Sequence, residues 1–397
     1  MQTGWRIGSL FGIPLFLDPL WFLILTLVTL NFGMNYLQWG DVLAWSAGLV
    51  MGLLLFGSVL LHELGHSLVA QSQGIKVNSI TLFLFGGIAA IEEESKTPGE
   101  ALQVAIAGPS VSIALFVLLT GLSLVLPASS LASEMVADLA RINLVVALFN
   151  LIPGLPLDGG QVLKAAVWKV TGNRFKAVHW AARAGQILGA SAIAAGFALD
   201  FFTGELVSGL WLVLLGWFGI RNANTYDRVT TLQEALLKLT VADAMTTEFR
   251  VLDADQTLRS FADHLLETAA PQTYFAASDG RYRGMVSVED LRLVERSQWE
   301  SQTLQSIVHP LTEIPSVVES TPLVKAIDQM ETHQLQRLTV LSPAGAVAGI
   351  IDRGDIVRSL ALKLNLKISD AEIKRIKEEG SYPPGLQLGA IAKSTTT

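Results

Sequence analysis

The motif His62-Glu63-Leu64-Gly65-His66 lies inside an apolar stretch, and this placement constrains the chain more than any other feature. The residues from Leu53 to Leu61 that precede it carry no charge. On an α-helix, His62 and His66 share one face, so both imidazoles can bind one Zn²⁺. Glu63 lies between them, where a carboxylate can take a proton from water at the metal. Because ionisable groups inside a membrane are costly, the motif predicts a hydrolytic zinc site rather than two core histidines.

Composition divides the chain into two parts. Of its 397 residues, 51% are hydrophobic and only 16% are charged, which is unusually apolar for a soluble protein. The apolar residues fill 21–219, whereas charge density is ordinary from Thr230 onward. We therefore expect an integral membrane domain followed by soluble material. The net charge of −7 argues against a nucleic-acid partner, and the absence of cysteine leaves histidine and carboxylate as zinc ligands.

Six helical segments are expected to cross the lipid bilayer, each near the roughly 20 residues that span its hydrocarbon core. They are 19–33, 43–71, 101–126, 135–152, 184–200 and 206–220. Lysine and arginine are missing from alternate connections, while Lys76, Lys164 and Arg221 lie in or beside the others. The positive-inside rule then places both the N-terminus and the C-terminal half in the cytoplasm. In this multi-pass arrangement, the histidine pair lies toward the cytoplasmic end of the second span.

A second polar motif runs from Asn150 to Gly160, with the sequence Asn-Leu-Ile-Pro-Gly-Leu-Pro-Leu-Asp-Gly-Gly. Its prolines and glycines break the helix at membrane depth, where irregular backbone is tolerated only inside protein or beside a wet cavity. Asp158 is therefore expected to be the third zinc ligand, which leaves the fourth position to water. The alternative is a cytoplasmic turn in which Asp158 caps the next helix.

Together, these two motifs resemble the paired signature of the site-2 protease family of intramembrane zinc metalloproteases, and the resemblance covers residues 1–225. It implies that His62, His66 and Asp158 bind one Zn²⁺ per chain and that Glu63 is the general base. It also implies that Asn150 contacts the substrate backbone near the scissile bond. Ala107-Gly108-Pro109 is similar to the start of the third core helix, although many relatives carry asparagine where Ser112 stands.

The segment 77–91 between the two motifs is β-branched and aromatic, and glycines interrupt it, which predicts a strand or hairpin. The hairpin is either structural or offers its edge to an extended substrate by β-augmentation. In the second case Gly86 and Gly87 are substrate-binding positions, because glycine permits close backbone approach. The segment 7–16 is expected to form another strand.

Two similar units follow a linker at 226–239, and they occupy 240–300 and 301–362. Each is expected to contain a helix, a pair of strands and a final helix that begins near an aspartate. An internal repeat of this kind indicates two halves that bury apolar faces against one another. The pattern resembles a tandem pair of cystathionine-β-synthase-type (CBS) domains. In the tail, 363–397, a short solvated helix at 369–379 precedes a segment that is expected to be flexible.

The resemblance to CBS pairs implies that Asp290 or Asp355 holds the ribose of an adenine nucleotide, with Ser287 assisting at the first site. Asp352 replaces the corresponding serine or threonine at the second site, where it would repel a phosphate. Nucleotide is thus expected at one site rather than two. The alternative is a pair that only packs or forms a homodimer, with both aspartates serving as helix N-caps.

The sequence therefore predicts a polytopic α-helical membrane protein with a short membrane-associated β segment and a cytoplasmic α/β CBS pair. The predicted function is zinc-dependent intramembrane cleavage of a single-span membrane protein, modulated by the CBS pair. By family analogy, the substrate resembles an anti-sigma factor and the location is a bacterial cell membrane. The alternative function is a CBS-gated transporter or ion-binding protein, which is disfavoured because the two halves show no matching pair of broken helices.

Overall fold

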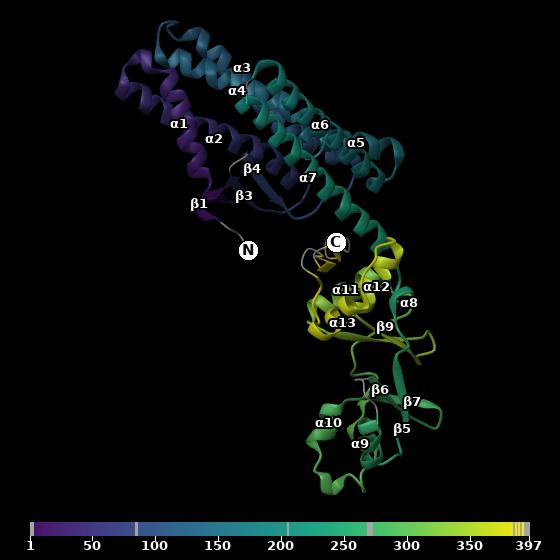
Figure 1. Cartoon of the computed structure of the whole chain (residues 1–397). Helices are drawn as coiled ribbons and strands as arrows, with labels where there is room; N and C mark the ends of the chain where they lie inside the picture. The colour runs from purple at the N-terminus through teal and green to yellow at the C-terminus, as the bar shows by residue number, and fades with distance from the viewer. Residues whose placement is uncertain are drawn as a thin grey trace. The chain divides into compact units, whose positions relative to one another are not determined.

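The computed structural model describes residues 4–83, 86–204, 206–267, 273–383, 386, 388–389 and 391–392. The chain forms two compact units, one ending at Thr230 and the other beginning at Thr231. The first contains the predicted membrane helices and the second contains the predicted CBS pair (Figure 1). Each unit is described by itself.

A four-stranded sheet in the first unit joins two separate parts of the sequence. Its order is β1 (Trp5–Leu10), β2 (Ile13–Leu17), β3 (Val77–Phe83) and β4 (Gly86–Ile91). The pairs β1–β2 and β3–β4 are antiparallel, and the central pair β2–β3 is parallel. This arrangement confirms the hairpin predicted at 77–91, whereas 7–16 was expected to be one strand and is divided into β1 and β2 by a turn at Phe11 and Gly12, both of which have positive φ. The edge strands are β1 and β4. Both β3 and β4 contact the helix α2, beside which they lie in Figure 1.

Among the residues that the structure describes, seven helices belong to the first unit, and the last of them continues into the second. They are α1 (Trp21–Asn35), α2 (Asp41–Ser72), α3 (Pro98–Val125), α4 (Leu131–Asn150), α5 (Asp158–Thr171), α6 (Arg174–Thr203) and α7 (Leu206–Leu237), and a single 3₁₀ turn, η1 (Leu37–Trp39), precedes α2. By length and composition, α2, α3, α6 and α7 are able to cross a membrane. The shorter α1 is apolar but has 15 residues, and α4 carries Glu134, Asp138 and Arg141.

The polytopic membrane fold is thus confirmed, although the boundary predicted after the last span differs from the structure. The segment 226–239 was expected to be a linker, but α7 continues to Leu237. The sequence contains neither proline nor glycine between Arg221 and Thr240, so nothing breaks the helix there. Leu232 and Leu236 of this extension are buried in the core of the second unit.

The second unit contains the same order of elements twice, which confirms the internal repeat. The first copy comprises α8 (Val241–Ala244), β5 (Phe249–Asp253), α9 (Leu258–Glu267), β6 (Thr273–Ser278), β7 (Arg281–Val286) and α10 (Val288–Leu293), followed by η2 (Arg296–Gln298), η3 (Leu304–Ile307) and β8 (His309–Pro310). The second comprises β9 (Ser316–Val318), α11 (Leu323–Thr332), β10 (Arg337–Leu341), β11 (Val347–Asp352) and α12 (Arg353–Lys363). In both copies the first two strands are parallel and the next pair is antiparallel.

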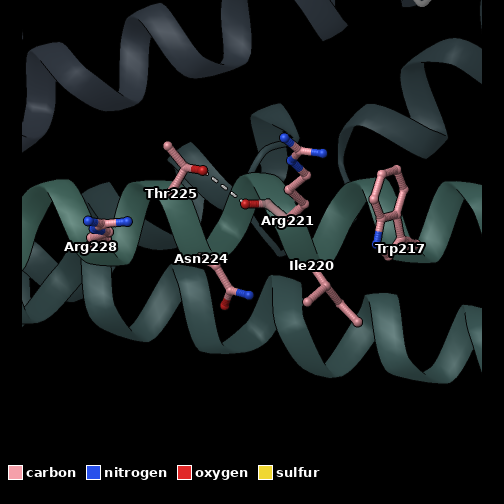
Figure 2. Close-up of a pocket in the computed structure, with 6 residues that line it drawn as sticks. All are labelled: Trp217, Ile220, Arg221, Asn224, Thr225 and Arg228. Carbon is pink, nitrogen blue, oxygen red and sulfur yellow. Dashed lines mark hydrogen bonds between the residues drawn. The ribbon is translucent and has the colours of Figure 1, made fainter. Parts of the chain in front are cut away.

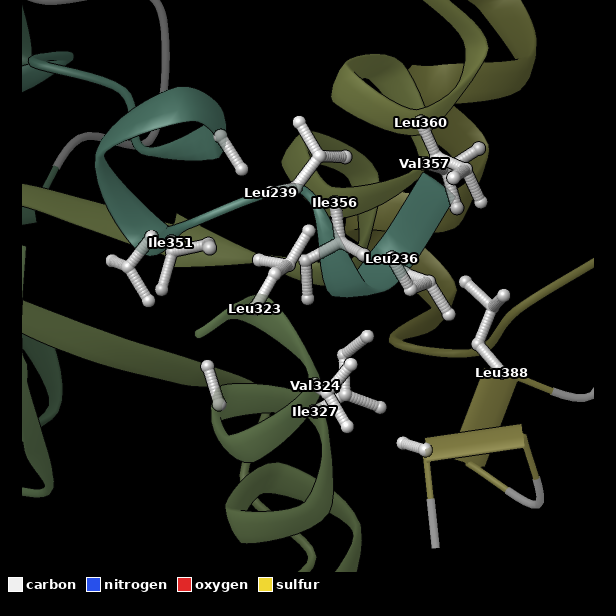
Figure 3. Close-up of a cluster of buried hydrophobic side chains, with 14 of the residues drawn as sticks. Leu236, Leu239, Leu323, Val324, Ile327, Ile351, Ile356, Val357, Leu360 and Leu388 are labelled. Atoms are coloured by element: carbon white, nitrogen blue, oxygen red, sulfur yellow. The ribbon is translucent and has the colours of Figure 1, made fainter. Parts of the chain in front are cut away.

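The C-terminal segment is packed more closely than the sequence suggested. Its helix α13 (Asp370–Glu379) buries Ile373 and Ile376, and the prediction of a merely solvated helix was wrong on that face. Leu388 and Ile391 are also buried, so the described part of the end is not a free tail. Figure 3 shows Leu388 beside the cluster that lies between α7, α11 and α12. Burial contributes about 1.5–3 kcal/mol for each such aliphatic side chain, which favours stable docking of this segment.

Candidate metal centre

Three candidate ligands come together from two helices. His62 and His66 are buried one turn apart on α2, as their spacing predicts, and Asp158 is the first residue of α5. The Nε2 atoms of the two histidines are 3.3 Å apart. Asp158 Oδ2 is 3.0 Å from His62 Nε2 and 3.3 Å from His66 Nε2. The helix break after α4 therefore returns a carboxylate to the histidine pair, about ninety residues along the chain.

A contact at the Nδ1 atom fixes the orientation of each imidazole ring. His66 Nδ1 lies 2.6 Å from the carbonyl oxygen of Val104, which can only accept, so this nitrogen carries the proton. His62 Nδ1 lies 3.0 Å from the hydroxyl oxygen of Ser112, a buried residue on α3. With its Nδ1 protonated, His66 presents the lone pair of Nε2 toward the point that His62 Nε2 also faces, an arrangement typical of histidines that bind a metal.

The absence of a side chain at Gly108 on α3 makes room for the two imidazole rings. A Cβ atom added at Gly108 would lie 2.1 Å from His66 Nε2 and 2.6 Å from His62 Nε2, much closer than any real contact. Only glycine therefore fits at this position. Gly108 belongs to the Ala107-Gly108-Pro109 sequence that resembles the start of the third core helix in the family.

The spacing of these atoms suits zinc. In a tetrahedral site with zinc–ligand bonds of about 2.0–2.1 Å, neighbouring ligand atoms lie about 3.3 Å apart. The three observed separations, 3.0, 3.3 and 3.3 Å, fit that value. Two neutral imidazoles and one carboxylate are also a donor set that zinc accepts in hydrolytic enzymes. The residues present thus fit a zinc ion with one position left for water.

Glu63 lies against β4. A Cβ atom added at Gly87 would be 2.4 Å from Glu63 Cγ, so this strand approaches the glutamate as closely as a backbone can. The backbone N–H of Ala89 donates a hydrogen bond to the Glu63 carboxylate. Gly86 pairs with Phe83 at the turn end of the hairpin and makes no such contact with Glu63 among the described residues. Of the two glycines predicted to meet substrate, Gly87 is the one placed beside the candidate base.

Asn150, the last residue of α4, also points into the site. Its amide nitrogen Nδ2 is 3.4 Å from His62 Nε2. An amide donor at this position can reach an oxygen atom bound near the metal, which is the kind of group that stabilises a developing oxyanion.

An ion-pair network links the end of the hairpin to the helix that carries Asp158. Glu94, which follows β4, accepts from Lys164 Nζ at 3.0 Å and lies 3.7 Å from Arg174. Lys164 is buried on α5. Although burial raises the pKa of Glu94, the two cations lower it below its ordinary value and keep the carboxylate charged. The network connects the segment after β4 to α5, the helix that begins with Asp158.

Ser112→Ala is expected to weaken zinc binding and activity about 10- to 100-fold, because loss of a group that orients a metal ligand has effects of this size. Ser110→Ala is the matched control, since that exposed hydroxyl bonds to Ile106 of its own helix. Ser112→Asn should retain much of the zinc affinity that Ser112→Ala loses, because the asparagine side-chain oxygen can accept a hydrogen bond from His62. Zinc affinity is measured by competition with a chelator. Equal affinities in the Ser110 and Ser112 alanine variants would contradict this positioning role.

A separate surface hollow of about 370 Å³ lies along α7 and offers different chemistry. Figure 2 shows Arg221 and Thr225 on one side of the helix and Ile220 and Asn224 on another. The lining residues are Trp217, Ile220, Arg221, Asn224, Thr225 and Arg228. They include no carboxylate or imidazole, so we assign the hydrolytic chemistry to the histidine and aspartate group.

The three residues predicted to bind nucleotide lie at the starts of two helices in the second unit. Ser287 is the N-cap of α10 and accepts from the N–H of Glu289, which fits the capping alternative. Asp290 Oδ2 lies 2.7 Å from Nε2 of His309, a residue that the sequence did not single out. Asp355 is buried in a capping box with Asp352 at the start of α12. The structure therefore brings Ser287 and Asp290 together and places Asp355 in the other half of the pair.

Two family models and several known proteins match this chain. The family model described as peptidase family M50 matches residues 50–139 and 127–192, and the CBS domain model matches 305–362. A Synechocystis protein named as a zinc metalloprotease, sll0528, is 40% identical over 91% of this chain and 96% of its own. Zinc metalloprotease MJ0392 of Methanocaldococcus jannaschii is 29% identical over 92% of this chain and 98% of its own.

Among solved structures, the site-2 protease from the same archaeon is 30% identical and covers 57% of this chain and 95% of that one, with a TM-score of 0.40. The relationship rests on the sequence identity to full-length relatives, together with the two family models. The chain therefore belongs to peptidase family M50, the site-2 protease family of zinc metalloproteases, and is a membrane enzyme that carries a CBS domain in its C-terminal half.

Proposed function

We propose that this metalloprotease cleaves a peptide bond of a single-span membrane protein inside the membrane, with Glu63 as base and His62, His66 and Asp158 as zinc ligands. The observation that carries the proposal is the position of the ligand group. Two ligands and the base lie on α2, a helix of 32 residues that is apolar enough to cross a bilayer. A site that cleaved a loop of a soluble substrate would not need to lie on a helix able to cross a bilayer.

The described side chains can perform each step of hydrolysis. His62, His66 and Asp158 would hold a zinc ion, which when bound would supply a Lewis acid to acidify water and polarise the scissile carbonyl. Glu63 takes the proton from the attacking water and later delivers it to the leaving nitrogen, so that water is added across the peptide bond. Asn150 donates a hydrogen bond to the carbonyl oxygen as negative charge develops there. The products are a carboxylate and an amine.

The edge strand β4 provides a place for the unwound substrate. The peptide groups of a membrane helix are hydrogen-bonded within the helix and are not accessible to the base, so the segment to be cut must become extended. As the last strand of the described sheet, β4 has an outer edge that is not paired with another described strand, and its backbone can add a substrate strand by β-augmentation. A strand bound there would lie beside both the base and the ligand group.

Mapping of the cut tests the proposed activity. We expect the enzyme in proteoliposomes to cleave a single-span reporter within its apolar segment, and mass spectrometry of the fragments locates the bond. Cleavage confined to the reporter's water-exposed flanks would contradict the proposal. A reporter that carries the membrane segment of a tethered regulator, such as an anti-sigma factor, is the first choice by analogy with the family.

Cross-linking tests the substrate strand. The chain contains no cysteine, so a single thiol can be placed at Ala90, an exposed position on β4. We expect disulfide formation with cysteines at alternate positions of the substrate segment, because strand neighbours alternate in direction. The control is Ser9→Cys on β1, which is exposed on the opposite edge of the same sheet. Cross-links from Ser9→Cys but not from Ala90→Cys would exclude β4 as the docking edge.

We also propose that the N-terminus and the CBS pair lie in the cytoplasm of a bacterial cell. The support is the distribution of lysine and arginine between the helices, for which the positive-inside rule gives this orientation. The CBS pair would then sense a cytoplasmic ligand, and an adenine nucleotide at Asp290 and Ser287 is the candidate. A ligand can change cleavage only if it binds two conformations of the enzyme with different affinities.

Asp290→Ala is expected to abolish measurable AMP binding to the purified full-length enzyme, because the carboxylate that holds the ribose is lost. Isothermal calorimetry measures the binding, and cleavage assays with and without AMP measure the modulation. Asp263→Ala is the matched control, since that exposed carboxylate pairs with Arg259 on α9. Unchanged AMP affinity in the Asp290 variant would remove this site and leave the pair as a packing or homodimer module.

A further inference from the structure

The C-terminal segment covers one of the two positions where a CBS pair would hold a ribose. Lys377 of α13 places its ammonium nitrogen 2.7 Å from Asp355 Oδ1 and 3.5 Å from Asp352 Oδ2. The Asp355 side chain is only 2% exposed, and that of Lys377 is 24% exposed. The carboxylate that would receive a ligand's hydroxyl groups is thus already bound to a cation of the same chain.

Electrostatics favours this contact. Burial raises the pKa of Asp355, the neighbouring carboxylate of Asp352 raises it further, and the bond to Lys377 opposes the rise. Two adjacent buried carboxylates are unfavourable without a cation between them. Lys377 therefore supplies the charge that this pair of aspartates needs in order to be buried.

Packing on both sides of the ion pair holds Lys377 in place. A Cβ atom added at Gly354 would lie 2.5 Å from Lys377 Cγ, so the lysine stem lies directly on the first turn of α12. Arg353 bonds to Glu331 at 2.9 Å and lies over the ring of Tyr382. Leu388 is buried farther along the same segment, beside the apolar cluster in Figure 3. The segment is anchored on the body of the second half along its described length.

The corresponding position in the first half is open by comparison. The Asp290 side chain is 23% exposed, and its partner His309 is 49% exposed on the short strand β8. A ligand can displace an exposed histidine side chain by rotation of that side chain alone. Access to Asp355 requires removal of a helix with two buried isoleucines.

We propose that the C-terminal segment is the resident occupant of the second CBS ligand site, with Lys377 in the place of a ribose. The pair is then a one-site module that binds one adenine nucleotide per chain, at Asp290. The count of nucleotides rests on the nucleotide function proposed above, whereas the occupancy of the second site by Lys377 does not. The segment completes the fold of the second half and takes no part in capturing the ligand.

Nucleotide binding to the full-length enzyme tests the first consequence, with AMP as the probe. We expect one equivalent of AMP per chain, complete loss of binding in Asp290→Ala, and an affinity within about twofold of wild type in Asp355→Asn. Asparagine preserves an oxygen for the capping contact with Asp352, so this variant removes the charge with little change of shape. Binding of two equivalents, or loss of binding in Asp355→Asn with Asp290→Ala unaffected, would overturn the proposal.

Thiol labelling tests the occupancy without any nucleotide. In this cysteine-free chain we place a single thiol at buried Ile376 or at exposed Glu378 of the same helix. Maleimide should react at least about tenfold more slowly at position 376, because reaction there requires local opening. Adding Lys377→Met should remove this protection, whereas Lys374→Met should not, since Lys374 pairs with Glu378 on the exposed face.

The two experiments fail independently. If the wild-type enzyme binds no AMP, the nucleotide function is wrong and the labelling rates alone decide the occupancy. Equal labelling rates at positions 376 and 378, or equal effects of the two lysine substitutions, would show that the segment is not held at Asp355.

Discussion

Glu63→Gln is expected to abolish peptide cleavage while the zinc content of the enzyme stays at one ion per chain. Glutamine has the same shape but cannot accept the proton from water, and general-base groups contribute about 10²–10⁴-fold to the rate. The ligand atoms of His62, His66 and Asp158 are unchanged in this variant, so the metal remains bound. Metal analysis and cleavage of a single-span reporter, performed on the same preparation, measure the two quantities.

The interpretation depends on an intact fold, so the melting midpoint of the Glu63 variant is compared with that of the wild type. Retention of the Ala89 contact is expected, because the glutamine oxygen can accept the same hydrogen bond. Turnover near the wild-type rate would exclude Glu63 as the base. Loss of zinc together with activity would instead make Glu63 part of the metal site.

Asp158→Ala should remove both zinc and activity, because two histidines alone leave the metal with too few protein ligands. The expected result is zinc well below one ion per chain after dialysis, with no detectable cleavage. Asp227→Ala is the matched control. Asp227 also pairs with a histidine, His179 at 2.6 Å, but it does not belong to the metal-binding group.

Full zinc content and normal activity in the Asp158 variant would contradict the assignment. The Pro- and Gly-rich break between α4 and α5 would then be only a turn in which Asp158 starts a helix. A variant that loses activity but keeps all its zinc would assign Asp158 to catalysis rather than to metal binding. A carboxylate that binds the zinc directly is compatible with neither outcome.

The ligand group could be predicted from the sequence because each signal has a local physical cause. His62 and His66 are linked by helical periodicity, and the break before Asp158 cannot be exposed to lipid. The short β segment could also be predicted from its composition. The contacts of Ser112 and Val104 could not, because nothing in a sequence states which faces of α2 and α3 meet.

The C-terminal segment shows the opposite situation. Ile373 and Ile376 form an apolar pair too short to distinguish from chance in a helix rich in lysine and glutamate. The contact between Lys377 and Asp355 joins residues that local patterns cannot relate, and the charge of each alone predicts exposure to solvent. The ion pair is known only from the tertiary structure. The difference between the two halves of the CBS repeat is known from the same source.

The most direct test of a single catalytic zinc is the return of the metal to enzyme that has been stripped of it. Purified protein is treated with chelator, reconstituted with a single-span reporter, and assayed for cleavage as Zn²⁺ is added in measured amounts. We expect no cleavage by the stripped enzyme and a linear recovery that ends at one zinc per chain. Full cleavage by enzyme that contains no detectable zinc would contradict the assignment of His62, His66 and Asp158 as ligands of a catalytic metal.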